Sequence, residues 1–189
     1  MLYSCVKVIL KIILSLLFRI KTVGKENVID GGAILAGNHS SNWDPVLVAV
    51  TCPRSLAFMA KSELFKFKPF GAFLKKLGVF PVQRGKGDIG AVKTALTILK
   101  QEKAMMMFPE GKRMKDGARG EAKPGVVMLA THAKVPVVPI KISGKFKPFK
   151  KIIISYGEPI YLDEYYGEKL TMEKMQALSE SIMDKIFSL

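Results

Sequence analysis

Residues 33–52, "AILAGNHSSNWDPVLVAVTC", place a strand, a polar loop and a helix one after another. "AILAG" has the length and apolarity of a buried strand, and "PVLVAVTC" has those of a short helix. We predict Asp44 as the N-cap of this helix and Pro45 as its first residue. A strand that leads directly into a helix is the unit of α/β proteins, whose ligands bind at the carboxyl ends of the strands. The polar loop at residues 37–45, "GNHSSNWDP", therefore lies where a functional site is expected.

The same alternation continues along the chain and predicts the fold class. We expect a single α/β domain in which a mixed, largely parallel sheet is flanked by helices. A chain of 189 residues with 49% apolar content is long enough for one substantial core. Further strands are predicted at "SLAFMA" (55–60), "VFPVQR" (79–84), "AMMMF" (104–108), "VPVVPIKI" (135–142) and "KIIISYG" (151–157). Helices are predicted at residues 61–78, 87–103, 126–134 and 170–187.

The N-terminal segment, residues 1–21, is strongly apolar but carries four basic residues. Its longest uncharged run, residues 12–18, is far shorter than the ~20 residues that cross a bilayer. We predict an amphipathic helix that lies in a membrane interface, followed by the main domain at residues 22–189. Packing of this helix against the domain is the alternative, and a cleaved signal peptide is disfavoured because Lys11 interrupts the apolar region. At helical spacing one polar stripe is formed by Ser4, Lys7, Lys11 and Ser15.

The charge balance indicates a polyanionic partner. The chain has 30 Lys and Arg against 16 Asp and Glu, a net charge of +14, which would suit nucleic acid, an anionic membrane or an acidic carrier protein. The sequence "KFKPF" at residues 66–70 and 145–149 places aromatic residues beside lysines, which favours a membrane surface. No strand pattern typical of RNA-binding domains is present, so we expect no nucleic-acid partner. Two cysteines and two histidines predict neither a disulfide framework nor a metal site.

Two polar loops contain the residues suited to chemistry. A histidine followed five positions later by an aspartate, His39 and Asp44, is a weak signal when it stands alone. The second loop, "FPEGKRMKDG" at residues 108–117, also follows an apolar strand, so both loops are expected at the same edge of a parallel sheet. Gly111 would let backbone N–H groups approach a ligand, and Arg113 offers a planar fork for phosphate oxygens.

Four ordered blocks carry a resemblance to a known family. They are "NHSSNWD", "GVFPVQR" at residues 78–84, "FPEGKR" at 108–113 and "VPVVPI" at 135–140. In this order and spacing they resemble the glycerolipid acyltransferases, in particular the bacterial 1-acylglycerol-3-phosphate acyltransferases of the PlsC type. The resemblance covers about residues 33–140. It implies a membrane enzyme that acylates the sn-2 hydroxyl of 1-acylglycerol 3-phosphate and so makes phosphatidate.

The resemblance also implies catalytic roles for the first block. His39 would act as general base toward the acceptor hydroxyl, and Asp44 would fix its tautomer and stabilise the imidazolium. The hydroxyl would attack the thioester of acyl-CoA or acyl-carrier protein directly, so neither an acyl-enzyme nor a cofactor is expected. We expect lysophosphatidic acid and anionic membrane lipids as partners, at the cytoplasmic face of the cell membrane.

The phosphate of the acceptor would be held by residues of the second and third blocks. The resemblance implies Arg84 and Arg113 for this role, with Glu110 and Gly111 shaping the turn of the third block. Lys61, just after a predicted strand, is a further candidate, although a surface lysine at a helix start explains it equally well.

The chain departs from the family pattern in the third block. Lys112 and Met114 stand where the family usually has threonine and serine, which leaves head-group specificity open. Another lysolipid or glycerol 3-phosphate is therefore an alternative acceptor, and a basic membrane-binding protein without catalysis is an alternative function. The fourth block, with Pro136 and Pro139, could be an edge strand with structural prolines.

Overall fold

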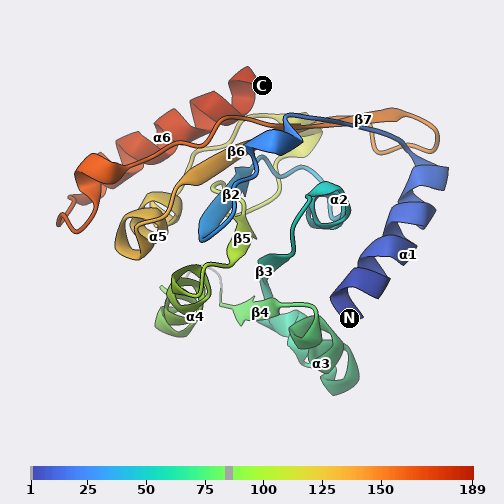
Figure 1. Cartoon of the computed structure of the whole chain (residues 1–189), viewed down its shortest axis with the longest axis horizontal. Helices are drawn as coiled ribbons and strands as arrows, with labels where there is room; N and C mark the ends of the chain where they lie inside the picture. The colour runs from blue at the N-terminus through green and yellow to red at the C-terminus, as the bar shows by residue number, and fades with distance from the viewer. Residues whose placement is uncertain (1, 84–86) are drawn as a thin grey trace.

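A seven-stranded sheet runs through the computed structural model, which describes residues 2–83 and 87–189 (Figure 1). The strand order is β1-β7-β6-β2-β5-β3-β4. β6 and β7 pair antiparallel and all other neighbours pair parallel, which confirms a mixed, largely parallel sheet. The strands are β1 (Arg19–Val23), β2 (Ala33–Gly37), β3 (Leu56–Lys61), β4 (Val79–Val82), β5 (Ala104–Met107), β6 (Val137–Gly144) and β7 (Lys151–Tyr156).

Helices cover both faces of the sheet, because successive residues of each strand point to opposite faces. In β2, Ala33 and Leu35 join the core under α1 and α2. Ile34 and Ala36 join the core under α4, α5 and α6 on the other face. α3 lies beside β4 at the end of the sheet (Figure 1). The helices are α1 (Leu2–Leu17), α2 (Asp44–Thr51), α3 (Lys68–Lys76), α4 (Ile89–Lys100), α5 (Gly125–Ala133) and α6 (Met172–Ser188), with short turns η1 (Lys25–Asn27), η2 (Ser62–Phe65), η3 (Lys115–Gly117) and η4 (Asp163–Tyr165).

The fourth sequence block forms β6, a central strand and not the edge strand considered above. Pro139 pairs with Ala36 of β2 although proline has no N–H to donate. The Val137 N–H donates to the Ile160 carbonyl, on the side of β6 away from β2. In a strand, the backbone N and carbonyl groups of every second residue point to the same side. The Pro139 nitrogen therefore faces the same side as the Val137 N–H, and the Pro139 carbonyl accepts there from the Gly157 N–H. The proline therefore leaves the β2 pairing intact.

α1 differs from the predicted helix in its end and in its orientation. It ends at Leu17, and the residues from Arg19 to Lys21 belong to β1, because they pair with β7. Leu14, a residue of α1, is fully buried against the domain. The Lys7 amine donates to the Cys52 carbonyl at the end of α2. Lys7 thus faces the domain, where it satisfies an unpaired carbonyl at a helix C-terminus. Packing of this helix on the domain, left open by the sequence, is what the structure has.

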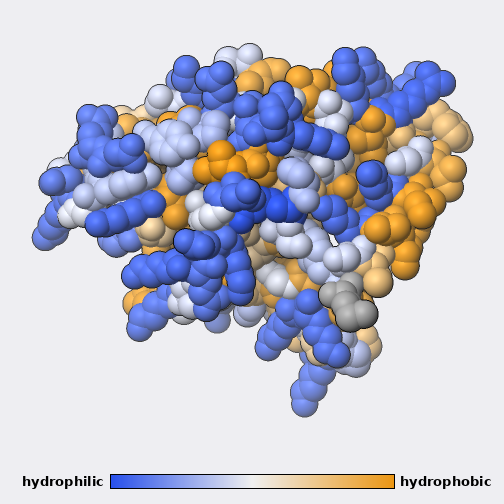
Figure 2. Space-filling model, in the orientation of Figure 1, coloured by the Kyte–Doolittle hydropathy of each residue, from blue (hydrophilic) through white to orange (hydrophobic). Residues whose placement is uncertain are grey.

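The outer face of α1 is apolar and exposed, as the patch at the right of Figure 2 shows. Among the described residues, no helix has the length and apolarity needed to cross a membrane. The division of the chain into a membrane-interface helix and a main domain stays a prediction. The exposed residues of this face include Val8, Ile9, Ile12, Ile13 and Leu16.

Candidate active site

The two predicted loops meet at one edge of the sheet. β2 and β5 are neighbouring parallel strands in which Ala36 lies opposite Met107. His39 and Glu110 each follow three residues later, so the strand register brings them side by side at the carboxyl ends of the strands. This confirms the expectation that both loops open at the same edge.

His39 and Asp44 form a buried pair in the first loop. The distance from His39 Nδ1 to Asp44 Oδ2 is 2.9 Å, and the two residues are 7% and 0% exposed. Because an ionised carboxylate only accepts hydrogen bonds, this contact assigns the ring proton to Nδ1. Nε2 then carries the lone pair, and no hydrogen bond to it is found among the described residues. The pair therefore has the arrangement of a base with an orienting carboxylate.

Asp44 is positioned differently from the prediction. The N-cap of α2 is Trp43, and Asp44 is the first helical residue. Its Oδ2 accepts from the backbone N–H groups of Ser40 and Ser41, each at 2.7 Å, and not from N–H groups of the helix. The loop folds back over the start of the helix, so amides of the loop, and not those of the helix, donate to the carboxylate. One oxygen thus binds three N–H donors, while the buried Oδ1 has no partner in the described part of the chain.

The second loop holds His39 from three directions. The Phe108 ring stacks on the imidazole with 4.0 Å between centroids and 14° between planes. The Met114 N–H donates to the His39 carbonyl at 2.7 Å, and the His39 N–H donates to Glu110 Oε2 at 2.8 Å. Glu110 is 2% exposed, and burial lowers the pKa of the nearby Lys141 amine, an effect that the Glu110 carboxylate opposes. The histidine is thus fixed by its ring and by its backbone.

Asn38 was not predicted as a site residue, but it fixes the start of the first loop. Its side-chain amide donates to the Ile142 carbonyl at 3.0 Å and accepts from the Ile142 N–H at 2.8 Å. These two bonds extend the pairing between β2 and β6 beyond the last residue of β2. The sequence shows only an asparagine after a strand, which is usual in turns, so its partner across the sheet could not be read from it.

The predicted phosphate residues lie around the same edge. Arg113 is exposed on the second loop beside Met114, and Lys61 is exposed at the carboxyl end of β3. Gly111 has a φ of 66° in a turn closed by its own N–H and the Phe108 carbonyl. Lys123, which the sequence analysis did not select, passes over this turn: a Cβ on Gly111 would lie 3.1 Å from Lys123 Cδ. The remaining predicted residue, Arg84, lies outside the described residues.

Comparisons with known proteins identify the family and the fold. The family model described as Acyltransferase matches residues 19–143. The 1-acyl-sn-glycerol-3-phosphate acyltransferase of Bacillus subtilis is 34% identical over 94% of this chain and 91% of its own. That of Streptococcus pneumoniae is 29% identical over 81% of this chain and 58% of its own. The crystal structure of the acyltransferase PlsC from Thermotoga maritima shares the fold, with a TM-score of 0.75, 22% identity and coverage of 99% and 80%.

The Asn38 contacts lead to a stability prediction. Asn38→Ala leaves the buried N–H and carbonyl of Ile142 without their partner, so the free energy of unfolding should fall by about 1–3 kcal/mol. Urea unfolding followed by circular dichroism measures this change. Asn42→Ala, in the same loop but exposed, is the matched control and should change it by less than ~0.5 kcal/mol. Equal losses in both variants would contradict the assigned role of Asn38.

Proposed function

The chain belongs to the acyltransferase family, and from this membership we propose that it acylates the sn-2 hydroxyl of 1-acylglycerol 3-phosphate. The observation that carries the proposal is the buried His39–Asp44 pair, with Nε2 unbound, beside a loop that presents basic side chains. The relatives from Bacillus subtilis and Streptococcus pneumoniae, named for this activity, support the choice of acceptor.

The proposed reaction uses His39 as general base. Nε2 takes the proton of the acceptor hydroxyl as its oxygen attacks the carbonyl carbon of an acyl thioester. Asp44, bound to Nδ1, stabilises the imidazolium that forms. When the tetrahedral intermediate collapses, the C–S bond breaks and the imidazolium proton goes to the departing thiolate. The ester and the free thiol of coenzyme A or acyl-carrier protein are the products, and His39 returns to its neutral form.

The acceptor phosphate is proposed to lie over the second loop. Arg113 and Lys112 are exposed there, and Lys123 crosses the Gly111 turn from the far end of the same loop. A phosphate held by these cations would place the glycerol hydroxyl within reach of His39. Met114, the residue after Arg113, donates its N–H to the His39 carbonyl, so Arg113 lies close to His39 in the structure. Lys112 adds a charge where the family pattern has a hydroxyl, so it supports a phosphate-bearing acceptor over a neutral one.

We further propose that the carboxyl edge of the sheet rests on an anionic membrane. Exposed apolar side chains follow the carboxyl ends of three parallel strands: Trp43 after β2, Phe67 after β3 and Phe149 after β6. Phe18, the buried residue that follows α1, contacts Trp43 edge-on, so the end of α1 lies beside these side chains. Apolar side chains bind the bilayer interface, and lysines are attracted to anionic headgroups. The lysines that accompany these residues are Lys66, Lys68, Lys147 and Lys150.

The catalytic proposal predicts the effect of removing the base. His39→Ala should reduce the rate of acyl transfer by roughly 10²–10⁴-fold, because no general base replaces the imidazole. The assay supplies radiolabelled acyl-CoA, or acyl-carrier protein, with a panel of lysolipids and glycerol 3-phosphate. His132→Ala, the exposed second histidine, is the control and should keep the wild-type rate. No transfer by the wild-type protein from either donor would refute the proposed function.

The phosphate proposal predicts a difference between acceptors. Arg113→Ala should raise the KM for lysophosphatidic acid roughly tenfold or more, since a charge-assisted contact is lost. A neutral monoacylglycerol should be affected little. Lys100→Ala, a charge removed from the end of α4, should leave both acceptors unchanged. Equal losses for charged and neutral acceptors would remove Arg113 from the phosphate site.

The membrane proposal predicts which substitutions weaken vesicle binding. Phe67→Ala with Phe149→Ala should lower binding to vesicles that contain anionic lipid about tenfold, because two exposed rings no longer enter the interface. Sedimentation with vesicles measures the bound fraction. Tyr161→Ala is the control, since this exposed residue follows β7 at the opposite edge of the sheet. An equal loss in the control variant, or none in the double variant, would reject this orientation.

A further inference from the structure

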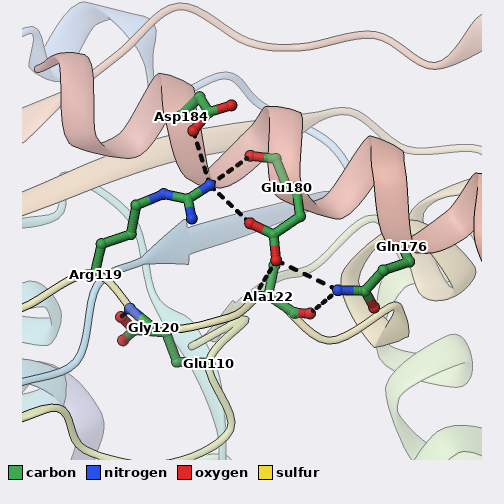
Figure 3. A network of polar contacts seen from close by, with 7 residues as sticks. All are labelled: Glu110, Arg119, Gly120, Ala122, Gln176, Glu180 and Asp184. Atoms are coloured by element: carbon green, nitrogen blue, oxygen red, sulfur yellow. Dashed lines mark hydrogen bonds and ion pairs between the residues drawn. The ribbon is translucent and has the colours of Figure 1, made fainter.

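A polar network joins residues 119–122, which follow the second loop, to α6 (Figure 3). Glu180 Oε2 and Asp184 Oδ1 each accept from the Arg119 guanidinium at 2.7 Å. Glu180 Oε1 accepts from the Ala122 N–H at 2.8 Å, and the Gln176 amide donates to the Ala122 carbonyl at 2.6 Å. The three helix residues stand four apart and so share one face of α6.

Gly120 lies between Arg119 and Ala122, the two residues that α6 binds. Its N–H donates to Glu110 Oε1 at 3.0 Å, while Glu110 Oε2 accepts from the His39 N–H at 2.8 Å. A continuous chain of contacts therefore runs from α6 through this loop segment and Glu110 to the backbone of His39. The packing is close, because a Cβ on Gly120 would lie 2.8 Å from Met114 Sδ and 3.2 Å from Glu110 Cγ.

α6 is a firm support for this chain of contacts. Its inner face is buried against α5 and β6 through Ile182, Met183 and Ile186. Arg119 itself is held at its tip by two carboxylates, with 38% of its side chain exposed. An ion pair this exposed contributes little to folding, so its presence is better explained by what it positions.

We propose that Arg119 and Glu180 are positioning residues that hold Gly120 so that Glu110 fixes His39 in its reactive place. This inference rests on the proposed acyl transfer for its kinetic consequence, but the contacts themselves do not depend on it. If the loop segment moves, Glu110 can no longer accept from both backbone donors. It either loses the Gly120 N–H or follows Gly120 and moves away from the His39 N–H. A displacement of about 1 Å at a catalytic group is enough to reduce a rate by roughly 10²-fold.

The kinetic test compares Arg119→Ala and Glu180→Ala with Lys185→Ala, an exposed α6 residue whose side chain makes no hydrogen bond or ion pair among the described residues. Both test variants should lower kcat roughly tenfold with the KM for the acceptor unchanged. The melting temperature of Arg119→Ala should stay within ~2 °C of the control. The double variant should lose no more than the larger single loss, because both residues act through one path. Arg119→Lys should recover part of the rate.

A second measurement tests the same contacts without activity. The chain has two histidines, so protein labelled only in histidine gives two backbone amide signals in the NMR spectrum. His132→Gln identifies the signal of the exposed histidine. In Arg119→Ala the His39 amide signal should shift, because its bond to Glu110 changes, while the His132 signal should not.

The outcomes separate this inference from the proposed function. If the wild-type protein transfers no acyl group, the proposed function fails, and the shift of the His39 signal still decides whether Arg119 positions it. Arg119→Ala with the kcat and the His39 signal of the control would overturn the inference. A raised KM for phosphate-bearing acceptors with kcat intact would also overturn it and make Arg119 a phosphate ligand.

Discussion

The site depends on one buried carboxylate oxygen, Oδ2 of Asp44. Three N–H donors converge on it, two from the backbone of Ser40 and Ser41 and one from the His39 ring. A fully buried charge is stable only where such donors replace water, so the oxygen dictates the path of the loop between β2 and α2. In the proposed reaction the same carboxylate stabilises the imidazolium. The interaction that folds the loop is thus the one that orients the His39 ring, as the proposed role of general base requires.

The parallel pairing of β2 and β5 supplies the second constraint. It places the two loops side by side, and the second loop then binds both backbone groups of His39 and covers its ring with Phe108. Asn38 secures the opposite side by pairing with β6. The histidine is therefore held from both neighbouring strands of β2. Nε2 is the one ring nitrogen that makes no hydrogen bond within the described residues. In the proposed reaction a histidine held so rigidly needs an acceptor brought to it in the correct orientation, which is the role proposed for the basic loop.

Sequence reasoning succeeded where short-range patterns decide the structure. The strand at residues 33–37, the helix that follows and the shared edge of the two loops all follow from apolar runs and turn residues. It failed where a distant partner decides. Arg19 to Lys21 look helical in isolation but pair with β7, and Lys7 turns inward because the Cys52 carbonyl lies there. Asp44 was expected to cap its own helix, and only the folded loop shows that the Ser40 and Ser41 amides reach it first.

The basic residues of the second loop show most clearly what the fold adds. Arg113 and Arg119 have the same side chain, stand six residues apart and cannot be told apart by composition. In the structure the carboxylates of Glu180 and Asp184 neutralise Arg119, whereas Arg113 is exposed near the base. A positive charge already paired at 2.7 Å offers a phosphate much less than one facing solvent. Arg119 is therefore bound within the protein, whereas Arg113 faces solvent, where the proposed phosphate would lie. The acidic face of α6 is what distinguishes these two arginines.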